Sequence, residues 1–180
     1  MGDRTLWNRI SDGDEAAFTE LFERHAEAVW NHAYRLTGSW AAAEDLASNT
    51  FLTAWRRRAD VTLVRDSALP WLYTVAGNAA RDEYRGARRR LRLLRKIPDP
   101  PVVSDHADAV AERIDGEQRL REIVDAVRTL PKSQRDVAEL CLLGEVSVAA
   151  AAALLTVAEV TVRSHLSRAR ARLRSLLEEK

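Results

Sequence analysis

The sequence is poor in the residues that most often carry catalysis or hold metals. Cysteine occurs once, as Cys141 within the apolar run 137–143, so an internal disulfide is excluded and a packing role is expected. The four histidines are scattered, with no ligand spacing among them or to the cysteine. The chain also lacks a glycine-rich phosphate loop. These absences predict a protein that is not an enzyme and needs no metal and no cofactor.

Long apolar runs are missing as well. No stretch approaches the roughly 20 apolar residues that cross a bilayer. The N-terminus is polar and charged, unlike a secretory signal peptide. At 180 residues and 46% hydrophobic, the chain is long enough for one large or two small domains with cores of their own. We therefore expect a cytoplasmic protein without membrane insertion.

Helical periodicity is what the sequence does contain, most clearly over residues 147–174. Ser147 is a suitable N-cap, and five alanines, residues 149–153, favour the helix that follows. The pattern breaks near residues 156–158. It resumes with apolar residues at steps of three and four, which form one stripe of a second helix. This stripe consists of Val162, Leu166, Ala169, Leu173 and Leu176.

The opposite side of the second helix is strongly basic. Five arginines and no acid fall between Arg163 and Arg174, a formal charge of about +5. A short helix, a tight turn and a basic helix predict a helix-turn-helix whose second helix enters the major groove of DNA. A solvated basic face on an ordinary bundle helix fits the same pattern.

The first part of the chain is predicted to be a helical hairpin. Asp14 is a suitable N-cap for a helix that ends at Gly38, and a second helix follows from about Trp40 to Arg58. In this second helix one side is apolar and the other is polar. The polar side, from Asp45 to Arg56, reads at this point as a solvent-facing surface.

The next helix, from about Trp71, has two distinct faces. One is apolar, and the other carries an aromatic ring, amide and arginines at steps of three or four, which suits single-stranded nucleic acid. Eight basic residues against two acids between Arg81 and Lys96 add a charge of about +6. The alternative is that Trp71 belongs to the core and the arginine run is a fraying helix end.

Residues 97–117 combine prolines with a net charge of about −5, which indicates a flexible acidic linker. Helical period resumes from about Gln118. We therefore predict an all-α protein with two small helical domains, residues 1–96 and 118–180, of which the second ends in the helix-turn-helix.

Two candidate DNA-binding surfaces joined by such a linker resemble the extracytoplasmic-function (ECF) sigma factors of bacterial RNA polymerase, in the sigma-70 family. The resemblance covers nearly the whole chain and rests on four stretches in the expected order. These are AAAEDLASNTFLTAW (residues 41–55), PWLYTVAGNAARDEYR (70–85), TLPKSQRDVAEL (129–140) and VTVRSHLSRARARLR (160–174).

The resemblance implies a role for each surface. The polymerase-docking surface would consist of Asp45, Leu46, Ser48, Asn49 and Leu52. The minus-ten promoter element would meet Trp71, Asn78, Asp82 and Arg85. The loop of residues 59–69 would capture a flipped-out base. The minus-thirty-five element would be read by Arg163, Ser164, Ser167 and Arg168, with Arg170 and Arg172 on phosphates.

The function implied is that of a promoter-specificity subunit, which binds core RNA polymerase and promoter DNA, both duplex and melted, and promotes strand opening. An anti-sigma factor is the further candidate partner. The chain departs from the family at Ser48 and Asn49, commonly glutamine and glutamate, and at Thr156 and Val160, often glycine. A stand-alone helix-turn-helix regulator is the alternative, although it needs no polymerase-docking surface.

Overall fold

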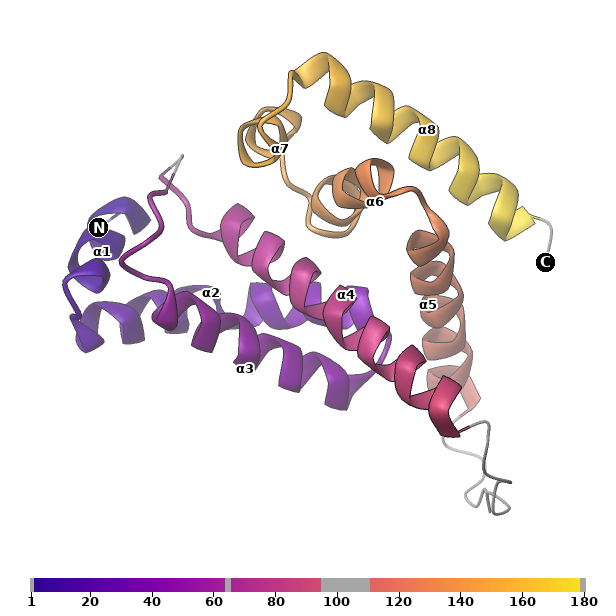
Figure 1. The fold of residues 1–180 in the computed structure, drawn as a ribbon, viewed down its shortest axis with the longest axis horizontal. Helices are drawn as coiled ribbons and strands as arrows, with labels where there is room; N and C mark the ends of the chain where they lie inside the picture. The colour runs from indigo at the N-terminus through magenta and orange to yellow at the C-terminus, as the bar shows by residue number, and fades with distance from the viewer. Residues whose placement is uncertain (1, 64–65, 95–110, 179–180) are drawn as a thin grey trace.

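Every regular element in the described part of the chain is a helix. The computed structural model describes residues 2–63, 66–94 and 111–178 (Figure 1). The helices form two units, one on each side of residues 95–110, which confirms the predicted all-α class with two helical domains. Most of the predicted linker, residues 97–110, lies outside the described residues.

The first domain contains α1 (Asp3–Ser11), α2 (Glu15–Thr37), α3 (Trp40–Arg56) and α4 (Leu69–Leu94). The predicted start of α2 is confirmed, because the Asp14 carboxylate accepts a hydrogen bond from the Ala17 amide at 3.0 Å. The predicted end is also confirmed, since Gly38 adopts the left-handed conformation with φ of 66°. α3 ends at Arg56, two residues before the predicted Arg58.

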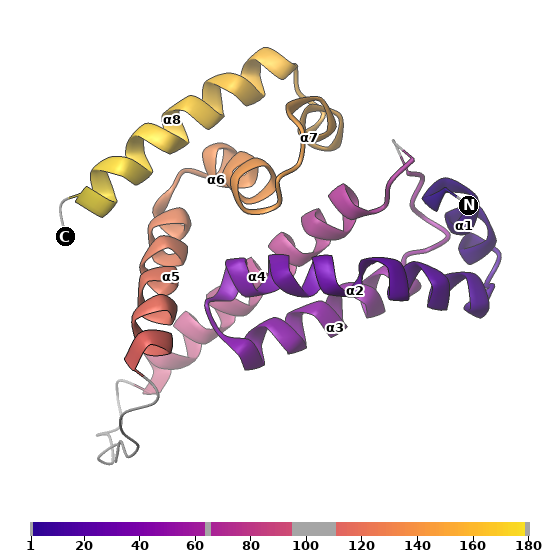
Figure 2. The ribbon, with the colours of Figure 1, turned by 180° about the vertical axis from the view of Figure 1, so that it is seen from behind.

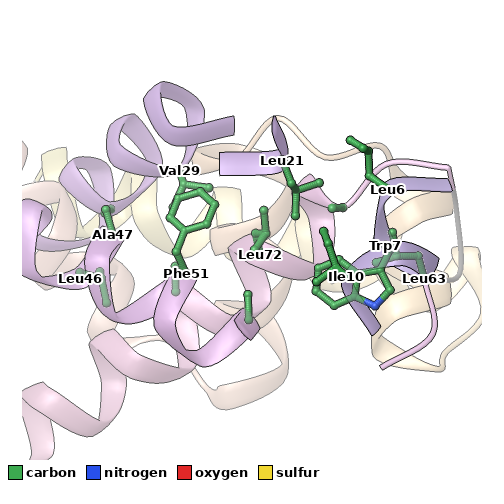
Figure 3. Close-up of a cluster of buried hydrophobic side chains, with 14 of the residues drawn as sticks. Leu6, Trp7, Ile10, Leu21, Val29, Leu46, Ala47, Phe51, Leu63 and Leu72 are labelled. Atoms are coloured by element: carbon green, nitrogen blue, oxygen red, sulfur yellow. The ribbon is translucent and has the colours of Figure 1, made fainter. Parts of the chain in front are cut away.

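α1 is an element that the periodicity did not reveal. Its Leu6, Trp7 and Ile10 are at most 2% exposed, and they close one end of the core. Figure 3 shows them beside Leu21 of α2 and Leu72 of α4. Burying a large apolar side chain contributes about 1.5–3 kcal/mol, so this short helix is integral to the domain.

Asp3 ties α1 to the start of α4. Its carboxylate accepts hydrogen bonds from the Ala68 amide at 2.8 Å and from Arg24 at 2.7 Å, and it lies 2.7 Å from Nε2 of His25. Burial by itself raises the pKa of Asp3, but these partners together hold it below its ordinary value. Asp3 is therefore an ionised hub that fixes where α4 begins.

The second domain contains α5 (Ala111–Thr129), α6 (Lys132–Ala138), a π-helical turn η1 (Glu139–Leu143), α7 (Val148–Leu155) and α8 (Glu159–Glu178). One predicted boundary is corrected. α5 begins at Ala111 rather than Gln118, so the end of the predicted linker is helical. α6 continues into the π-helical turn η1 at Glu139, and the Val146 amide closes this turn by donating to the Leu140 carbonyl at 2.9 Å.

The helix-turn-helix forms where it was predicted. Ser147 caps α7 by accepting from the Ala150 amide at 3.2 Å, and Thr156 ends it in the left-handed conformation. α7 and α8 then meet at 107°. Among the described helices, none alone is both long and apolar enough to cross a membrane, and only this bent pair meets the length and composition criteria jointly.

The second domain rests on the first along α4 and α2. Figures 1 and 2 show α6 between α4 and α8 from both sides, with α8 farthest from the first domain. α5 packs against α2, and η1 and α7 pack against α4. α3 lies on the opposite side of the first domain. The second domain therefore covers one face of α4, and α3 and α8 lie on the outside of the molecule.

Candidate functional site

α8 presents its basic face to solvent. The predicted stripe lies beneath it: Val162, Leu166 and Ala169 are buried, and Leu173 and Leu176 are half-buried. Ser164 is half-buried and the other predicted DNA contacts are exposed, namely Arg163, Ser167, Arg168, Arg170 and Arg172. Arg163 donates to Glu159 at 2.7 Å within the helix, an exposed ion pair that is easily exchanged. A DNA duplex therefore has open access to this face.

Two apolar residues at the N-terminal end of α8 were not among the predicted contacts. Val160 is 69% exposed and Val157, just before the helix, is 40% exposed. The N-terminal residues of the second helix are those that reach base edges in helix-turn-helix proteins. The sequence signal for Val160 was its position outside the buried stripe.

Four of the five residues of the predicted docking surface form an exposed stripe on α3, and the fifth is buried. Asp45, Ser48, Asn49 and Leu52 follow one another at steps of three, one and three, and all are exposed. Leu46 is 1% exposed and belongs to the core, so its side chain is unavailable to a partner and its place in the prediction is corrected. The surface is acidic and polar around a single exposed leucine.

The predicted stripe on α4 is only partly open. Asn78, Asp82 and Arg85 are exposed. Trp71 is half-buried, because its ring packs edge-on against Trp7 with the centroids 5.1 Å apart. One side of the Trp71 ring therefore packs on the core and the remainder is accessible, and its role toward single-stranded DNA stays a prediction.

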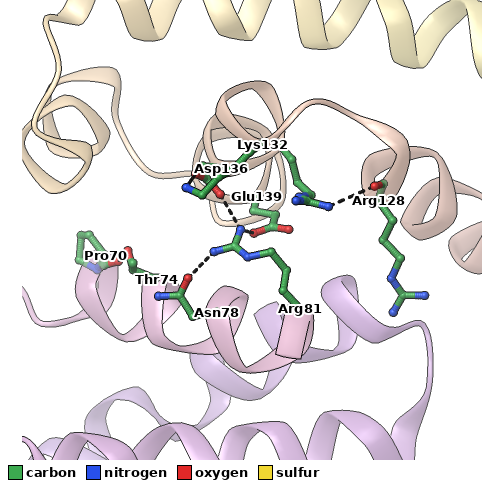
Figure 4. A network of polar contacts seen from close by, with 9 residues as sticks. Pro70, Thr74, Asn78, Arg81, Arg128, Lys132, Asp136 and Glu139 are labelled. Atoms are coloured by element: carbon green, nitrogen blue, oxygen red, sulfur yellow. Dashed lines mark hydrogen bonds and ion pairs between the residues drawn. The ribbon is translucent and has the colours of Figure 1, made fainter. Parts of the chain in front are cut away.

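Arg81, on the same side of α4, joins the two domains and was not predicted as a site residue. Its Nη1 donates to Asp136 at 2.6 Å and to Glu139 at 2.8 Å, and its Nη2 donates to the side-chain oxygen of Asn78 (Figure 4). Lys132 donates to the second oxygen of Asp136 at 2.8 Å. The side-chain oxygen of Asn78 therefore already accepts a hydrogen bond within the chain.

The position of Glu139 between the domains shifts the pKa of its carboxyl group. Burial raises its pKa to about 7, with the guanidinium of Arg81 acting in the opposite direction and the neighbouring Asp136 adding to the rise. The side chain of Glu139 is 10% exposed and that of Arg81 is 15% exposed. The interdomain contact thus contains a carboxyl that titrates near neutrality.

The loop before α4 is held by α1. Trp7 Nε1 donates to the Val61 carbonyl at 2.8 Å, and the Ser11 hydroxyl donates to the Arg58 carbonyl at 3.0 Å. Residues 64–65 of the predicted base-capture loop, residues 59–69, lie outside the described residues. On its other side, a cavity of about 30 Å³ separates Ser67 and Trp71 from the alanines of α7.

Comparison with known proteins gives these surfaces a context. The family model for sigma-70 region 2 matches residues 21–90, and the model for sigma-70 region 4 matches residues 120–173. The ECF RNA polymerase sigma factor SigL of Mycobacterium tuberculosis is 35% identical over 169 residues, 92% of each chain.

Two solved structures resemble the whole fold. One shows CnrH in complex with the cytosolic domain of CnrY, with a TM-score of 0.68 and 25% identity over 99% of this chain and 98% of that one. The other shows the sigma factor RpoE with the anti-sigma factor NepR from Bartonella quintana. It has a TM-score of 0.59 and 25% identity over 89% of this chain and 96% of that one.

Proposed function

This chain belongs to the ECF sigma factors of the sigma-70 family, and we propose here which of its surfaces carries each part of that function. It is a promoter-specificity subunit that binds core RNA polymerase and promoter DNA, and it is not itself an enzyme. Its work requires three surfaces: one for polymerase, one for duplex DNA and one for the melted strand. A sigma factor acts where polymerase acts, so the protein works in the bacterial cytoplasm.

α8 reads the minus-thirty-five element. Its exposed Arg163, Ser167 and Arg168 face the bases of the major groove, with the half-buried Ser164 beside them. Arg170 and Arg172 hold phosphates, which fix the register of the helix on DNA. The observation that supports this role is that no element of the first domain covers this face of α8 in the described chain.

α4 and the loop before it meet the minus-ten element. Trp71 supplies a ring for stacking, while Asn78, Asp82 and Arg85 supply polar groups along one stripe. Base–aromatic stacking contributes about 1–3 kcal/mol per base, which offsets the cost of separating the strands. The division into residues 1–96, 97–117 and 118–180 corresponds to these two DNA-binding units and the segment between them.

α3 docks on core polymerase through Asp45, Ser48, Asn49 and Leu52. The observation that carries the whole proposal is that the α3 stripe and the α8 face are both open, on opposite sides of the molecule. Polymerase and duplex DNA can therefore be held at the same time. An anti-sigma factor, as in the RpoE complex, is the partner expected to compete for these surfaces.

Run-off transcription with bacterial core polymerase on a pool of genomic promoters tests this function. New start sites that depend on the protein are expected, and their alignment gives both promoter elements. Asp45→Ala should weaken core binding about tenfold, in the range of a lost charged contact. Glu44→Ala, which removes the same charge from the neighbouring exposed position, is the control. Equal loss in both variants would contradict the docking assignment.

A further inference from the structure

The minus-ten face of α4 is exposed at Asn78, Asp82 and Arg85, but its Arg81 is covered by the chain's own second domain. Arg81 lies one turn beyond Asn78 on this face, and both of its carboxylate partners, Asp136 and Glu139, come from beyond the linker. All three side chains are at most 15% exposed. This cluster is a buried contact between two domains, unlike the exposed intrahelical ion pairs elsewhere in the chain.

Two glycines of the first domain lie against side chains of the second. A Cβ atom added to Gly77 would lie 2.8 Å from Oε2 of Glu139, closer than real contacts allow. One added to Gly38 would lie 3.0 Å from Cγ of Arg121. At Gly77 the contacting atom is the end of a flexible side chain, so an added Cβ would displace the Glu139 carboxylate.

The alanine-rich helix α7 covers the other end of the same face. α7 packs against α4, and its Ala150, Ala153 and Leu154 line a small cavity together with Pro70, Trp71 and the loop residues Thr62, Leu63 and Ser67. Small side chains permit this approach of one helix to another. The run of alanines thus has a use outside DNA binding, since it lets α7 lie close to the loop before α4.

We propose that Arg81 is a phosphate contact for the minus-ten strand, and that Asp136 and Glu139 occupy it as an intramolecular substitute for DNA. The inference rests on the proposed function of α4. A guanidinium pairs with carboxylate and phosphate by the same forked geometry, so the two ligands compete for one site. The strand reaches Arg81 only after the second domain has moved away.

The free energy of the Arg81 contact is small enough for the two domains to separate. Two carboxylates and a guanidinium are taken out of water here, and this desolvation offsets most of the attraction between them. The strand then sees only the open fraction of the protein, and its apparent affinity is reduced by that fraction. A chain that is open about one time in ten loses about tenfold in affinity for single-stranded DNA.

The test compares charge-matched variants of the full chain. The Asp136→Asn/Glu139→Gln variant removes the two carboxylates that hold Arg81. The Asp125→Asn/Glu117→Gln variant removes the same two charges from α5, where each pairs with an arginine of its own helix. Fluorescence anisotropy with a short single-stranded DNA of mixed sequence, at fixed salt, gives the affinity. Small-angle scattering gives the radius of gyration.

The first variant should bind the strand about tenfold more tightly than the control and show a larger radius of gyration. Gly77→Ala provides a second route, because it favours helix α4 while its Cβ displaces the Glu139 carboxylate. It should also bind more tightly. Arg81→Gln added to either variant should remove the gain.

Equal affinity of the first variant and its control would overturn the inference, as would a gain that survives Arg81→Gln. The proposed function fails separately: if the wild-type chain directs no run-off transcription from core polymerase, α4 has no minus-ten role. Run-off activity without any gain from opening would overturn the intramolecular competition alone.

Discussion

The basic faces of α8 and α4 carry similar chemistry but are presented in opposite ways. On α8 the arginines are exposed, and Arg163 has its ion-pair partner in the same helix. On α4 the corresponding Arg81 is paired with carboxylates of the other domain and is nearly buried. The comparison shows that the proposed duplex contacts are exposed in the free chain, whereas under our proposal Arg81 becomes available to a melted strand only when the domains separate.

Arg168→Ala is expected to give the largest effect, because its side chain is exposed on a face that no element of the first domain covers in the described ranges. Binding to the preferred minus-thirty-five duplex should weaken by about 1–3 kcal/mol, with relaxed preference at one base pair. Electrophoretic mobility shifts on a panel of single-base variants measure this. Arg172→Ala should instead weaken all duplexes alike and lower the salt slope by about 1. A uniform loss for Arg168→Ala would reassign it to the phosphates.

Asn78→Ala should act differently in the free chain and in the complex with core polymerase. In the free chain the Asn78 side chain already accepts from Arg81, so the variant should bind single-stranded DNA nearly as the wild type does. With core polymerase, where the face is open, strand separation at the minus-ten element should fall about tenfold, because a base-edge contact is lost. Permanganate footprinting measures the melted region. Asn31→Ala, at an exposed position of α2, is the control, and normal melting in Asn78→Ala would remove it from the site.

Local features of this fold followed from the sequence, and long-range ones did not. The caps at Asp14 and Ser147 and the buried stripe of α8 depend on neighbours within two turns, so periodicity and cap chemistry were sufficient to predict them. Arg81 was missed because its partners, Asp136 and Glu139, are 55 and 58 residues away, beyond the linker.

Leu46 is a different case, because the helical spacing of α3 placed it on the apolar side that can face the core. Only the resemblance added it to the docking surface, and its burial agrees with the spacing. α1 escaped prediction because a short helix carries too few turns for a clear period, and it is held by Asp3 through contacts more than 20 residues away.

The next smaller effect is the pH dependence of closure, by which we mean the packing of the second domain on α4 through Arg81, Asp136 and Glu139. In the closed chain burial raises the pKa of Glu139 to about 7, although Arg81, Arg135 and Arg128 oppose the rise and Asp136 adds to it. In an open chain the carboxyl returns toward its model value of 4.5, so closure takes up a proton. Closure is therefore favoured at low pH and weakened as the pH rises through about 7.

Single-strand binding should accordingly strengthen a few-fold between about pH 6.5 and pH 8, in the sense opposite to ordinary charge effects on DNA binding. The gain should stop below about pH 6.5. His32 is buried beside Tyr73 and Leu143, and burial lowers its pKa to about 4, so its protonation opposes closure there. Titration of the affinity measures this, and Glu139→Gln should flatten the upper part of the curve. A wild-type curve as flat as that of Glu139→Gln would contradict the linkage.

Val160→Ala tests the smallest difference between the two faces, which is that α8 also exposes apolar surface at its N-terminal end. Val160 is 69% exposed one turn before Arg163, where a valine methyl can touch the methyl group of thymine in the major groove. Truncation should cost about 1 kcal/mol or less on the preferred duplex, the value of about one buried methylene.

Replacing each thymine of the element with uracil removes the partner methyl. At the contacted position the DNA change and Val160→Ala should then not add, whereas Leu177→Ala at the far end of α8 should add to it fully. Additivity at every thymine would leave Val160 as exposed surface without a role in readout, and α8 would then read DNA through polar groups alone, unlike α4 with its Trp71 ring.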